Sequence, residues 1–206
     1  MSPSKFRVRR IFGRSVGWVA VHLASAGVRP NTVTYVTLML SLFAFLTLTV
    51  TQVQWAYGLL VFLMGFMDGV DGSLARRTGQ STAYGALADS VIDKVTEIVI
   101  LLAIPLTYRD AELLGLPLHL WTTLCISGWL LTSYVRSCAE RLGAHDLDIG
   151  LGARSERLFI LVIAAILGCV EVGVGLTAII SMLTAAYRYH HYGQEIRHAE
   201  RDGSQQ

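Results

Sequence analysis

Four aspartates in one stretch of apolar sequence have the types and spacing to bind cations. Asp68 and Asp71 are three residues apart, and Asp89 and Asp93 are four apart. On helices, each pair would project from one face. An ionised carboxylate at membrane depth costs roughly 2.5–3.5 kcal/mol or more, so four within 26 residues require positive partners. The basic residues nearby are Arg76, Arg77 and Lys94. Carboxylate oxygens suit Mg²⁺ or Mn²⁺, and we expect these four side chains to hold two such ions.

Two divalent ions a few ångströms apart would support phosphoryl transfer. Such a pair can bind a diphosphate and stabilise both the attacking and the leaving oxygen. The small residues Gly69, Gly72 and Gly85 leave room beside the carboxylates for a nucleotide or a phosphate. The region therefore indicates a metal-dependent reaction on a phosphorylated substrate.

The spacing of these residues also resembles a known family. The pattern is Asp68-x₂-Asp71-Gly72-x₂-Ala75-Arg76-x₈-Gly85-x₃-Asp89-x₃-Asp93. It is similar to the motif of the CDP-alcohol phosphotransferases at every fixed position. Members of that family transfer a phosphatidyl-type group from a CDP-linked lipid to an alcohol and release CMP.

The resemblance implies a role for each residue of the motif. It implies that Asp68, Asp71 and Asp89 ligate the metals, and that Asp93 completes the site and acts as the general base on the acceptor hydroxyl. It further implies a nucleotide-binding border made by Gly72, Ala75, Arg76 and Gly85. Homodimers are common in the family, so a homodimer is expected here.

Four arginines near predicted helix ends could bind the acceptor alcohol if it carries a phosphate. They are Arg136, Arg154, Arg157 and Arg188. The alternatives are plain positive-inside topology and binding to acidic lipid headgroups. The segments Ser133-Tyr134-x-Arg136 and Ser155-Glu156-Arg157-Leu158 resemble the members that use inositol 1-phosphate. Cys138 and Lys94 depart from that subgroup, which more often has a basic residue and an arginine there. Glycerol 3-phosphate is the alternative acceptor.

The composition predicts an all-α integral membrane protein. Of 206 residues, 53% are hydrophobic and only 16% are charged, whereas roughly a quarter are charged in soluble domains. Six apolar segments have approximately the length of transmembrane helices. They cover about 32–50, 55–76, 84–106, 118–141, 156–170 and 172–189. The last two are short, and a tight turn is expected near Glu171 and Gly173.

Basic residues predict the orientation of these spans. They gather before the first span, after the second, around the connection of the fourth to the fifth, and after the sixth, whereas the other side has only Arg109. Both termini and the aspartates are therefore expected on the cytoplasmic side of the cell membrane. Residues 4–26 have apolar residues at helical spacing with arginines between them, which indicates an amphipathic helix in the interface. The alternative is a helix packed on the protein.

We therefore predict one membrane domain over residues 1–206. It comprises an amphipathic segment (1–28), a six-helix catalytic core (29–190) and a polar tail (191–206) that frays from about Arg188 onward. The predicted partners are a CDP-linked lipid, a phosphorylated polyol and the membrane, with no nucleic acid. A rival of another class is a metal-ion transporter using intramembrane carboxylates. The predicted aspartates lie toward one side of the membrane only, which disfavours a transport path.

Overall fold

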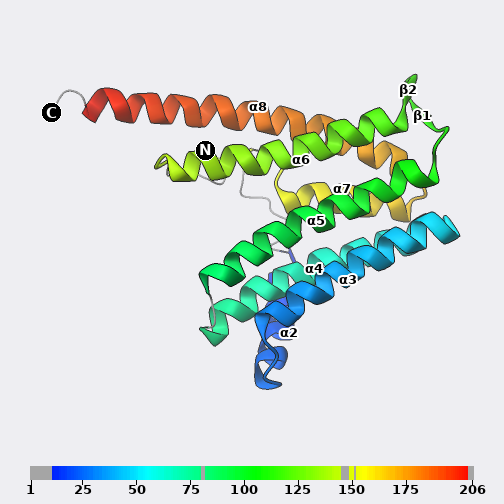
Figure 1. Ribbon diagram of the computed structural model, residues 1–206, viewed down its shortest axis with the longest axis horizontal. Helices are drawn as coiled ribbons and strands as arrows, with labels where there is room; N and C mark the ends of the chain where they lie inside the picture. Colours follow the sequence, from blue (N-terminus) through cyan, green and yellow to red (C-terminus); the bar gives the residue numbers. More distant parts are fainter. Residues whose placement is uncertain (1–10, 80–81, 145–148, 151, 204–206) are drawn as a thin grey trace.

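The computed structural model describes residues 11–79, 82–144, 149–150 and 152–203, and helices dominate it (Figure 1). The first ten residues of the predicted amphipathic segment and the last three residues of the predicted tail lie outside the described residues. In chain order the elements are α2 (Gly13–Ser25), α3 (Pro30–Leu46), the π-helical segment η2 (Thr47–Thr51), α4 (Gln54–Thr78), α5 (Ala83–Thr107), β1 (Glu112–Leu113), β2 (Leu116–Pro117), α6 (Leu118–Arg141), α7 (Arg154–Ile166) and α8 (Val170–Gly203).

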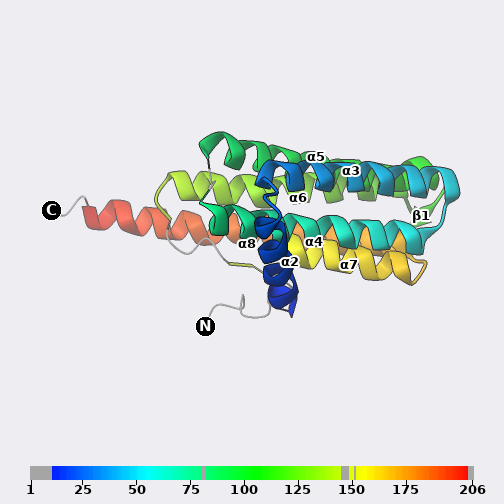
Figure 2. The ribbon, with the colours of Figure 1, turned by 90° about the horizontal axis from the view of Figure 1, so that it is seen from below.

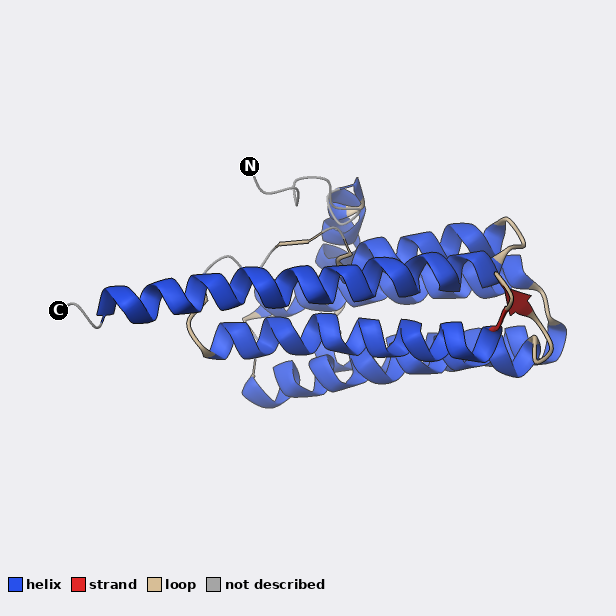
Figure 3. Ribbon diagram, turned by 90° about the horizontal axis from the view of Figure 1, so that it is seen from above, coloured by secondary structure: helices blue, strands red, loops and turns tan. Residues whose placement is uncertain are grey.

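Helices α3 to α8 lie side by side in a bundle, and α2 runs across it (Figure 2). The core draws buried residues from all six bundle helices, among them Tyr57 of α4, Ile100 of α5 and Trp129 of α6. The Tyr57 hydroxyl donates a hydrogen bond of 2.9 Å to the Ile100 carbonyl, which fixes α4 against α5. The short hairpin of β1 and β2 closes one end of the bundle (Figure 3).

Three of the described helical stretches are long and apolar enough to cross a membrane. They are Pro30–Thr51, Gln54–Thr78 and Val170–Ala199. Helices α5 and α6, with 25 and 24 residues, have sufficient length, but α5 carries the charged residues of the predicted site. The protein is therefore an all-helical membrane protein, and the six-span layout remains a prediction.

Helix α7 is shorter than its predicted span. It ends at Ile166 because Gly168, with a φ of 75°, reverses the chain. The Gly168 and Cys169 amides then donate to the carbonyls of Ala165 and Ala164, as in a Schellman motif. Its 13 residues rise about 20 Å, against about 30 Å of hydrocarbon. The turn therefore lies a few residues before the position predicted near Glu171.

Helix α8 is longer than its predicted span and continues to Gly203 through the stretch that was expected to fray. Figure 1 shows its end projecting beyond the rest of the bundle. Tyr192, about one turn into this extension, is buried with Ala139, Ala144 and Ile149. This packing against the end of α6 supplies apolar burial that the composition of the tail does not suggest.

Helix α2 packs on the protein through one apolar face. Ala20 is fully buried in a cluster with Val33 of α3 and with Val70 and Leu74 of α4. Trp18, on another face, is 64% exposed. The helix therefore has an inner face on the bundle and an outer apolar residue available to a membrane.

Candidate active site

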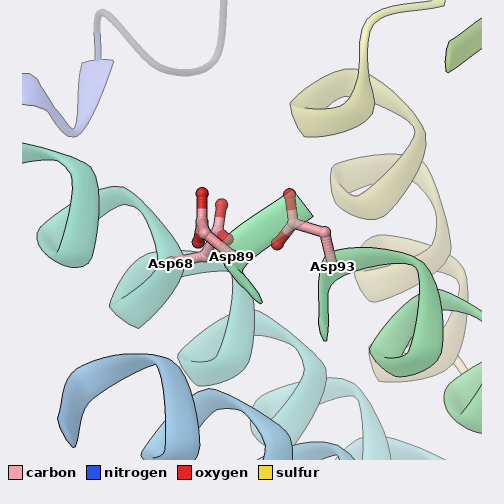
Figure 4. Close-up of side chains that lie close together, drawn as sticks. All are labelled: Asp68, Asp89 and Asp93. Atoms are coloured by element: carbon pink, nitrogen blue, oxygen red, sulfur yellow. The ribbon is translucent and has the colours of Figure 1, made fainter. Parts of the chain in front are cut away.

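Three of the predicted aspartates converge between α4 and α5. Asp68, Asp89 and Asp93 each offer a carboxylate oxygen, and these oxygens lie within 4.8 Å of one another (Figure 4). The i, i+4 spacing places Asp89 and Asp93 on one face of α5, as predicted. Asp68 precedes the end of α4 by about 15 Å, and Asp93 follows the start of α5 by about 15 Å. The two antiparallel helices thus bring their carboxylates to the same depth.

The start of α5 is fixed by its cap. The Thr82 hydroxyl accepts a hydrogen bond of 3.0 Å from the Gly85 amide. A Cβ atom on Gly85 would lie 3.0 Å from the same hydroxyl oxygen. Gly85, predicted to border the nucleotide, therefore has a local role in beginning the helix that carries Asp89 and Asp93.

Asp71 is not a member of this group of three. It is buried at 5% exposure, and its Oδ2 accepts a hydrogen bond from the Thr34 hydroxyl of α3. Asp71 thus contacts α3, while Asp68 faces the other aspartates. Its predicted role as a metal ligand remains a proposal.

Arg154, at the start of α7, forms ion pairs with three carboxylates. Its Nη1 lies 2.5 Å from Asp68 Oδ2, its Nη2 lies 3.0 Å from Asp93 Oδ1, and its Nε lies 2.8 Å from Glu97 Oε1. Glu97 is 1% exposed and also accepts from Lys94 Nζ at 3.0 and 3.1 Å. The structure therefore places one predicted acceptor-binding arginine directly on the predicted metal ligands.

The backbone at the start of α7 is held by Glu156. Its Oε2 accepts a hydrogen bond of 2.9 Å from the Ala153 amide. This contact satisfies one of the amides that a helix leaves unpaired at its N-terminus. It fixes the turn from which Arg154 projects.

A cavity of about 540 Å³ opens beside this cluster. Its polar lining includes Asp68, Asp89, Asp93, Arg76, Arg136 and Arg154. Its apolar lining comes from α2 and the residue before it, from α4 and from α7, and includes Phe12, Val16, Phe62, Phe66, Leu158 and Phe159. One cavity therefore offers charged groups and an apolar wall, as an amphiphilic substrate requires.

Two of the four predicted nucleotide-binding residues lie at the cavity wall, and two do not. Gly72 and Arg76 line the cavity, whereas Ala75 and Gly85 are not among its lining residues. Arg76 folds back over Gly72, and its Nη1 lies 3.3 Å from where a Cβ on Gly72 would be. Because Gly72 has no side chain, the Arg76 guanidinium can pack against its backbone at the cavity wall.

The predicted acceptor-binding arginines divide in the same way. Arg136 and Arg154 line the cavity. Arg157 and Arg188 are 2% and 6% exposed and lie behind this wall. Arg157 Nη1 donates to the Thr132 hydroxyl at 3.1 Å, and its guanidinium lies 4.8 Å from the centre of the Trp129 ring. Arg188 donates to the carbonyls of Thr132 and Ile149 at 3.0 and 2.9 Å.

Two residues of the site were given no function in the sequence-based prediction, although Glu97 belongs to a segment, Asp89-Ser90-x₂-Asp93-Lys94-x₂-Glu97, that resembles the inositol-phosphate-using members. Glu97 continues the spacing of Asp89 and Asp93 by one more turn, so the i, i+4 pattern could have identified it. Thr34, the partner of Asp71, lies 37 residues away on another helix, and no local pattern signals it.

The geometry fits a divalent metal ion. Three carboxylates from two helices supply the hard oxygen ligands that Mg²⁺ and Mn²⁺ prefer. Their negative charge is balanced in part by Arg154, which forms ion pairs with Asp68 and Asp93. The chemistry of the donors is therefore that of a divalent-metal site.

Comparisons with known proteins agree with this chemistry. Residues 28–188 match the sequence model of the family described as CDP-alcohol phosphatidyltransferase. The chain is 35% identical over 168 residues to the archaetidylinositol phosphate synthase of Pyrococcus horikoshii, which covers 82% of this chain and 85% of that protein. It is 28% identical over 199 residues to the phosphatidylinositol phosphate synthase of Mycobacterium tuberculosis, covering 92% of this chain and 91% of that one.

The fold is also similar to solved structures. The crystal structure of the M. tuberculosis phosphatidylinositol phosphate synthase with CDP-DAG bound has a TM-score of 0.72 and 26% identity, covering 87% of this chain and 94% of that chain. The same enzyme in complex with manganese and citrate also has a TM-score of 0.72, at 25% identity, covering 86% and 88%. These relationships favour a transferase over the metal-ion transporter considered above. Because the family model matches most of the chain and the archaeal relative is 35% identical over 82% of it, the chain belongs to the CDP-alcohol phosphatidyltransferase family.

Proposed function

We propose that this protein transfers a phosphatidyl- or archaetidyl-type group from a CDP-linked lipid to inositol 1-phosphate and releases CMP. The observation that carries the proposal is the shared cavity, in which three converging aspartates and three arginines lie beside an apolar wall. The names of the relatives support the choice of inositol phosphate over glycerol 3-phosphate.

The donor would bind with its diphosphate at the aspartates. Two divalent ions, Mg²⁺ or Mn²⁺, held by Asp68, Asp71, Asp89 and Asp93, would neutralise the diphosphate and stabilise the departing CMP. Gly72, Ala75, Arg76 and Gly85 would border the cytidine nucleotide, with Arg76 as the charged group at the cavity wall. The apolar lining from α2 and α4, which includes Phe12 and Phe62, would contact the lipid chains.

The reaction would be one displacement at phosphorus. The acceptor hydroxyl oxygen attacks the phosphorus attached to the lipid, and the bond from that phosphorus to the oxygen of CMP breaks. Asp93 takes the proton of the hydroxyl, because a neutral hydroxyl is a weak nucleophile. The products are the lipid phosphodiester, which now carries inositol phosphate, and CMP.

The phosphate of the acceptor would be held by the arginines of the site. Arg136 and Arg154 line the cavity and would contact it directly. Arg157 and Arg188, buried behind them, would reach it by exchanging their hydrogen bonds to the Thr132 region. A planar guanidinium suits phosphate because it offers two parallel donors.

The arrangement in the membrane is part of the proposal. We place residues 1–206 in one multi-pass membrane domain with six spans, both termini and the active site on the cytoplasmic side, and α2 in the interface. The exposed Trp18 on α2 supports contact with lipid. A homodimer is proposed from the family resemblance.

The experiment is a measurement of CMP release by purified protein in lipid nanodiscs. CDP-linked lipids with ester-linked acyl chains and with ether-linked isoprenoid chains are each combined with inositol 1-phosphate, glycerol 3-phosphate or free inositol. We expect Mn²⁺- or Mg²⁺-dependent CMP release with inositol 1-phosphate, and none from an Asp89→Asn control. CMP release with glycerol 3-phosphate but not with inositol 1-phosphate would overturn the acceptor assignment.

A further inference from the structure

Arg154 pairs with two of the predicted metal ligands. Its Nη1 and Nη2 lie at 2.5 and 3.0 Å from Asp68 and Asp93, two of the three converging carboxylates. One guanidinium therefore contacts two of the carboxylates that a divalent cation would bind. A metal ion and Arg154 would compete for these carboxylates, because two positive charges held at the same pair of side chains repel each other.

The third contact of Arg154 is to a residue outside the metal group. Its Nε donates to Glu97, one turn beyond Asp93 on α5, at 2.8 Å. Glu97 is 1% exposed and is also bound by Lys94. This anchor does not involve the metal ligands, so it can hold Arg154 at the cavity wall while the terminal nitrogens change partners.

The hold on Asp93 is the weaker of the terminal contacts. Arg154 Nη2 is buried and, among the described residues, makes no hydrogen bond of good geometry, although it lies at ion-pair distance from Asp93. Arg154 also lines the cavity. A small displacement of its terminal nitrogens would therefore turn unused donors toward the cavity.

We propose that Arg154 is an exchangeable counter-ion, which neutralises Asp68 and Asp93 until a metal ion binds them. Metal binding then displaces the two terminal nitrogens of Arg154 toward the acceptor phosphate, while its Nε stays bound to Glu97. The displacement of Arg154 by metal stands on the geometry alone, whereas its transfer to a phosphate rests on the proposed function. Metal loading would then prepare the phosphate site, and acceptor binding would depend on it. Arg154 is a competitor of the metal in one state and a phosphate ligand in the other.

The first test measures Mn²⁺ binding alone, with no donor and no acceptor. The dissociation constant is determined by electron paramagnetic resonance of free Mn²⁺ for the wild type and for Arg154→Gln. The matched control is Arg136→Gln, which removes the same charge from the wall of the same cavity. We expect about tenfold tighter Mn²⁺ binding in Arg154→Gln and less than about threefold in Arg136→Gln, because loss of bulk charge is common to both.

If Mn²⁺ affinity rose equally in Arg154→Gln and Arg136→Gln, the loss of one positive charge near the site would explain both, and the proposal would be overturned. Weaker binding in Arg154→Gln would also overturn it, since Arg154 would then support the metal site. Thermal unfolding checks that each variant is folded. If Arg154→Gln does not fold, Arg154→Lys keeps the charge without the fork that bridges Asp68, Asp93 and Glu97, and it should still bind Mn²⁺ more tightly than the wild type.

The second test measures the coupling between metal and phosphate, which must be reciprocal. Inositol 1-phosphate, at a concentration that saturates each variant, should tighten Mn²⁺ binding in the wild type and in Arg136→Gln, and this tightening should be largely lost in Arg154→Gln. Full retention in Arg154→Gln would overturn the transfer to phosphate. This result does not depend on turnover, so a failure of the CMP assay and a failure of this inference can be told apart.

Discussion

At the scale of single residues, Asp93 has two proposed tasks, as a metal ligand and as the base. Asp93→Asn keeps the shape but removes the proton acceptor, so turnover should fall at least 10²-fold. The affinity for the CDP-linked lipid should change much less, because Asp68 and Asp89 remain. Steady-state CMP release and calorimetric titration with the donor measure the two quantities.

The matched control for this variant is Asp110→Asn. It makes the same isosteric change in the connection between α5 and β1, near the opposite end of the bundle. Turnover within about threefold of the wild type in both variants would exclude Asp93 as the base.

The two kinds of arginine in the site predict different effects. Arg136→Ala removes a cavity-lining charge and should raise the KM for inositol 1-phosphate about tenfold, with little change for the donor. Arg157→Ala removes a buried side chain that packs on Trp129 and donates to Thr132, so it should lower the unfolding temperature as well as weaken the acceptor. Enzyme kinetics and thermal unfolding of both variants measure these effects. Equal weakening of donor and acceptor by Arg136→Ala would instead favour a role in binding acidic lipid headgroups.

Residue spacing predicts contacts within a helix better than contacts between helices. The i, i+4 rule correctly placed Asp89 and Asp93 on one face, and their convergence with Asp68 followed from the short connection of two antiparallel helices. The contact of Asp71 with Thr34 depends on the packing of α3, which local spacing does not encode. The burial of Arg157 has the same cause, because Trp129 and Thr132 belong to α6.

At the scale of elements, close contact between α7 and α8 helps to set the position of Arg154. A Cβ on Gly173 of α8 would lie 2.6 Å from the Cβ of Ala164 and 3.6 Å from the Cα of Leu161, both in α7. Gly173→Ala must therefore push the helices apart, at a cost of about 1–3 kcal/mol. We expect a lower unfolding temperature and reduced turnover, measured by thermal unfolding and CMP release.

Gly193→Ala is the control for this substitution because it lies in the same helix. A Cβ there would have only the flexible Arg197 Nη2 at 3.7 Å within 4 Å. It should leave stability unchanged or raise it slightly, since alanine favours a helix over glycine by up to about 1 kcal/mol. If the two variants were equally stable, close packing at Gly173 would not position α7.

The ends of the helices show which signals the sequence carries. The predicted fourth span, 118–141, coincides with α6, and the predicted second and third spans end within two residues of α4 and α5. The end of α8 was predicted too early, because the polar composition after Arg188 hides Tyr192, whose burial against α6 depends on tertiary packing. Apolar composition therefore predicts where helices lie, and packing decides where they stop.

At the scale of the whole molecule, the ends of the bundle differ in charge. The connections from α4 to α5 and from α6 to α7 lie at the end that carries most of the arginines. Among the residues that the structure describes, Arg109 is the one arginine at the opposite end, where the hairpin of β1 and β2 lies. By the positive-inside rule, the arginine-rich end and the active site near it should face the cytoplasm.

Cysteine labelling tests this orientation. Single cysteines are introduced as Thr82→Cys, at the start of α5, and as Leu114→Cys, which is 82% exposed in the hairpin, after replacing Cys125, Cys138 and Cys169 with alanine. A membrane-impermeant maleimide should label Thr82→Cys only in inside-out vesicles and Leu114→Cys only in right-side-out vesicles. The CMP assay verifies that the cysteine-free background is folded.

The labelling pattern also decides where the water-soluble substrates enter. If the pattern is as expected, the carboxylates lie about 15 Å from the helix ends at the cytoplasmic face, and both the acceptor and CMP move through that opening. The reversed pattern would put the active site on the outer side, where the acceptor would have to be supplied from outside the cell. Labelling of both positions in the same vesicles would place both ends of the bundle on one side, which six spans cannot do.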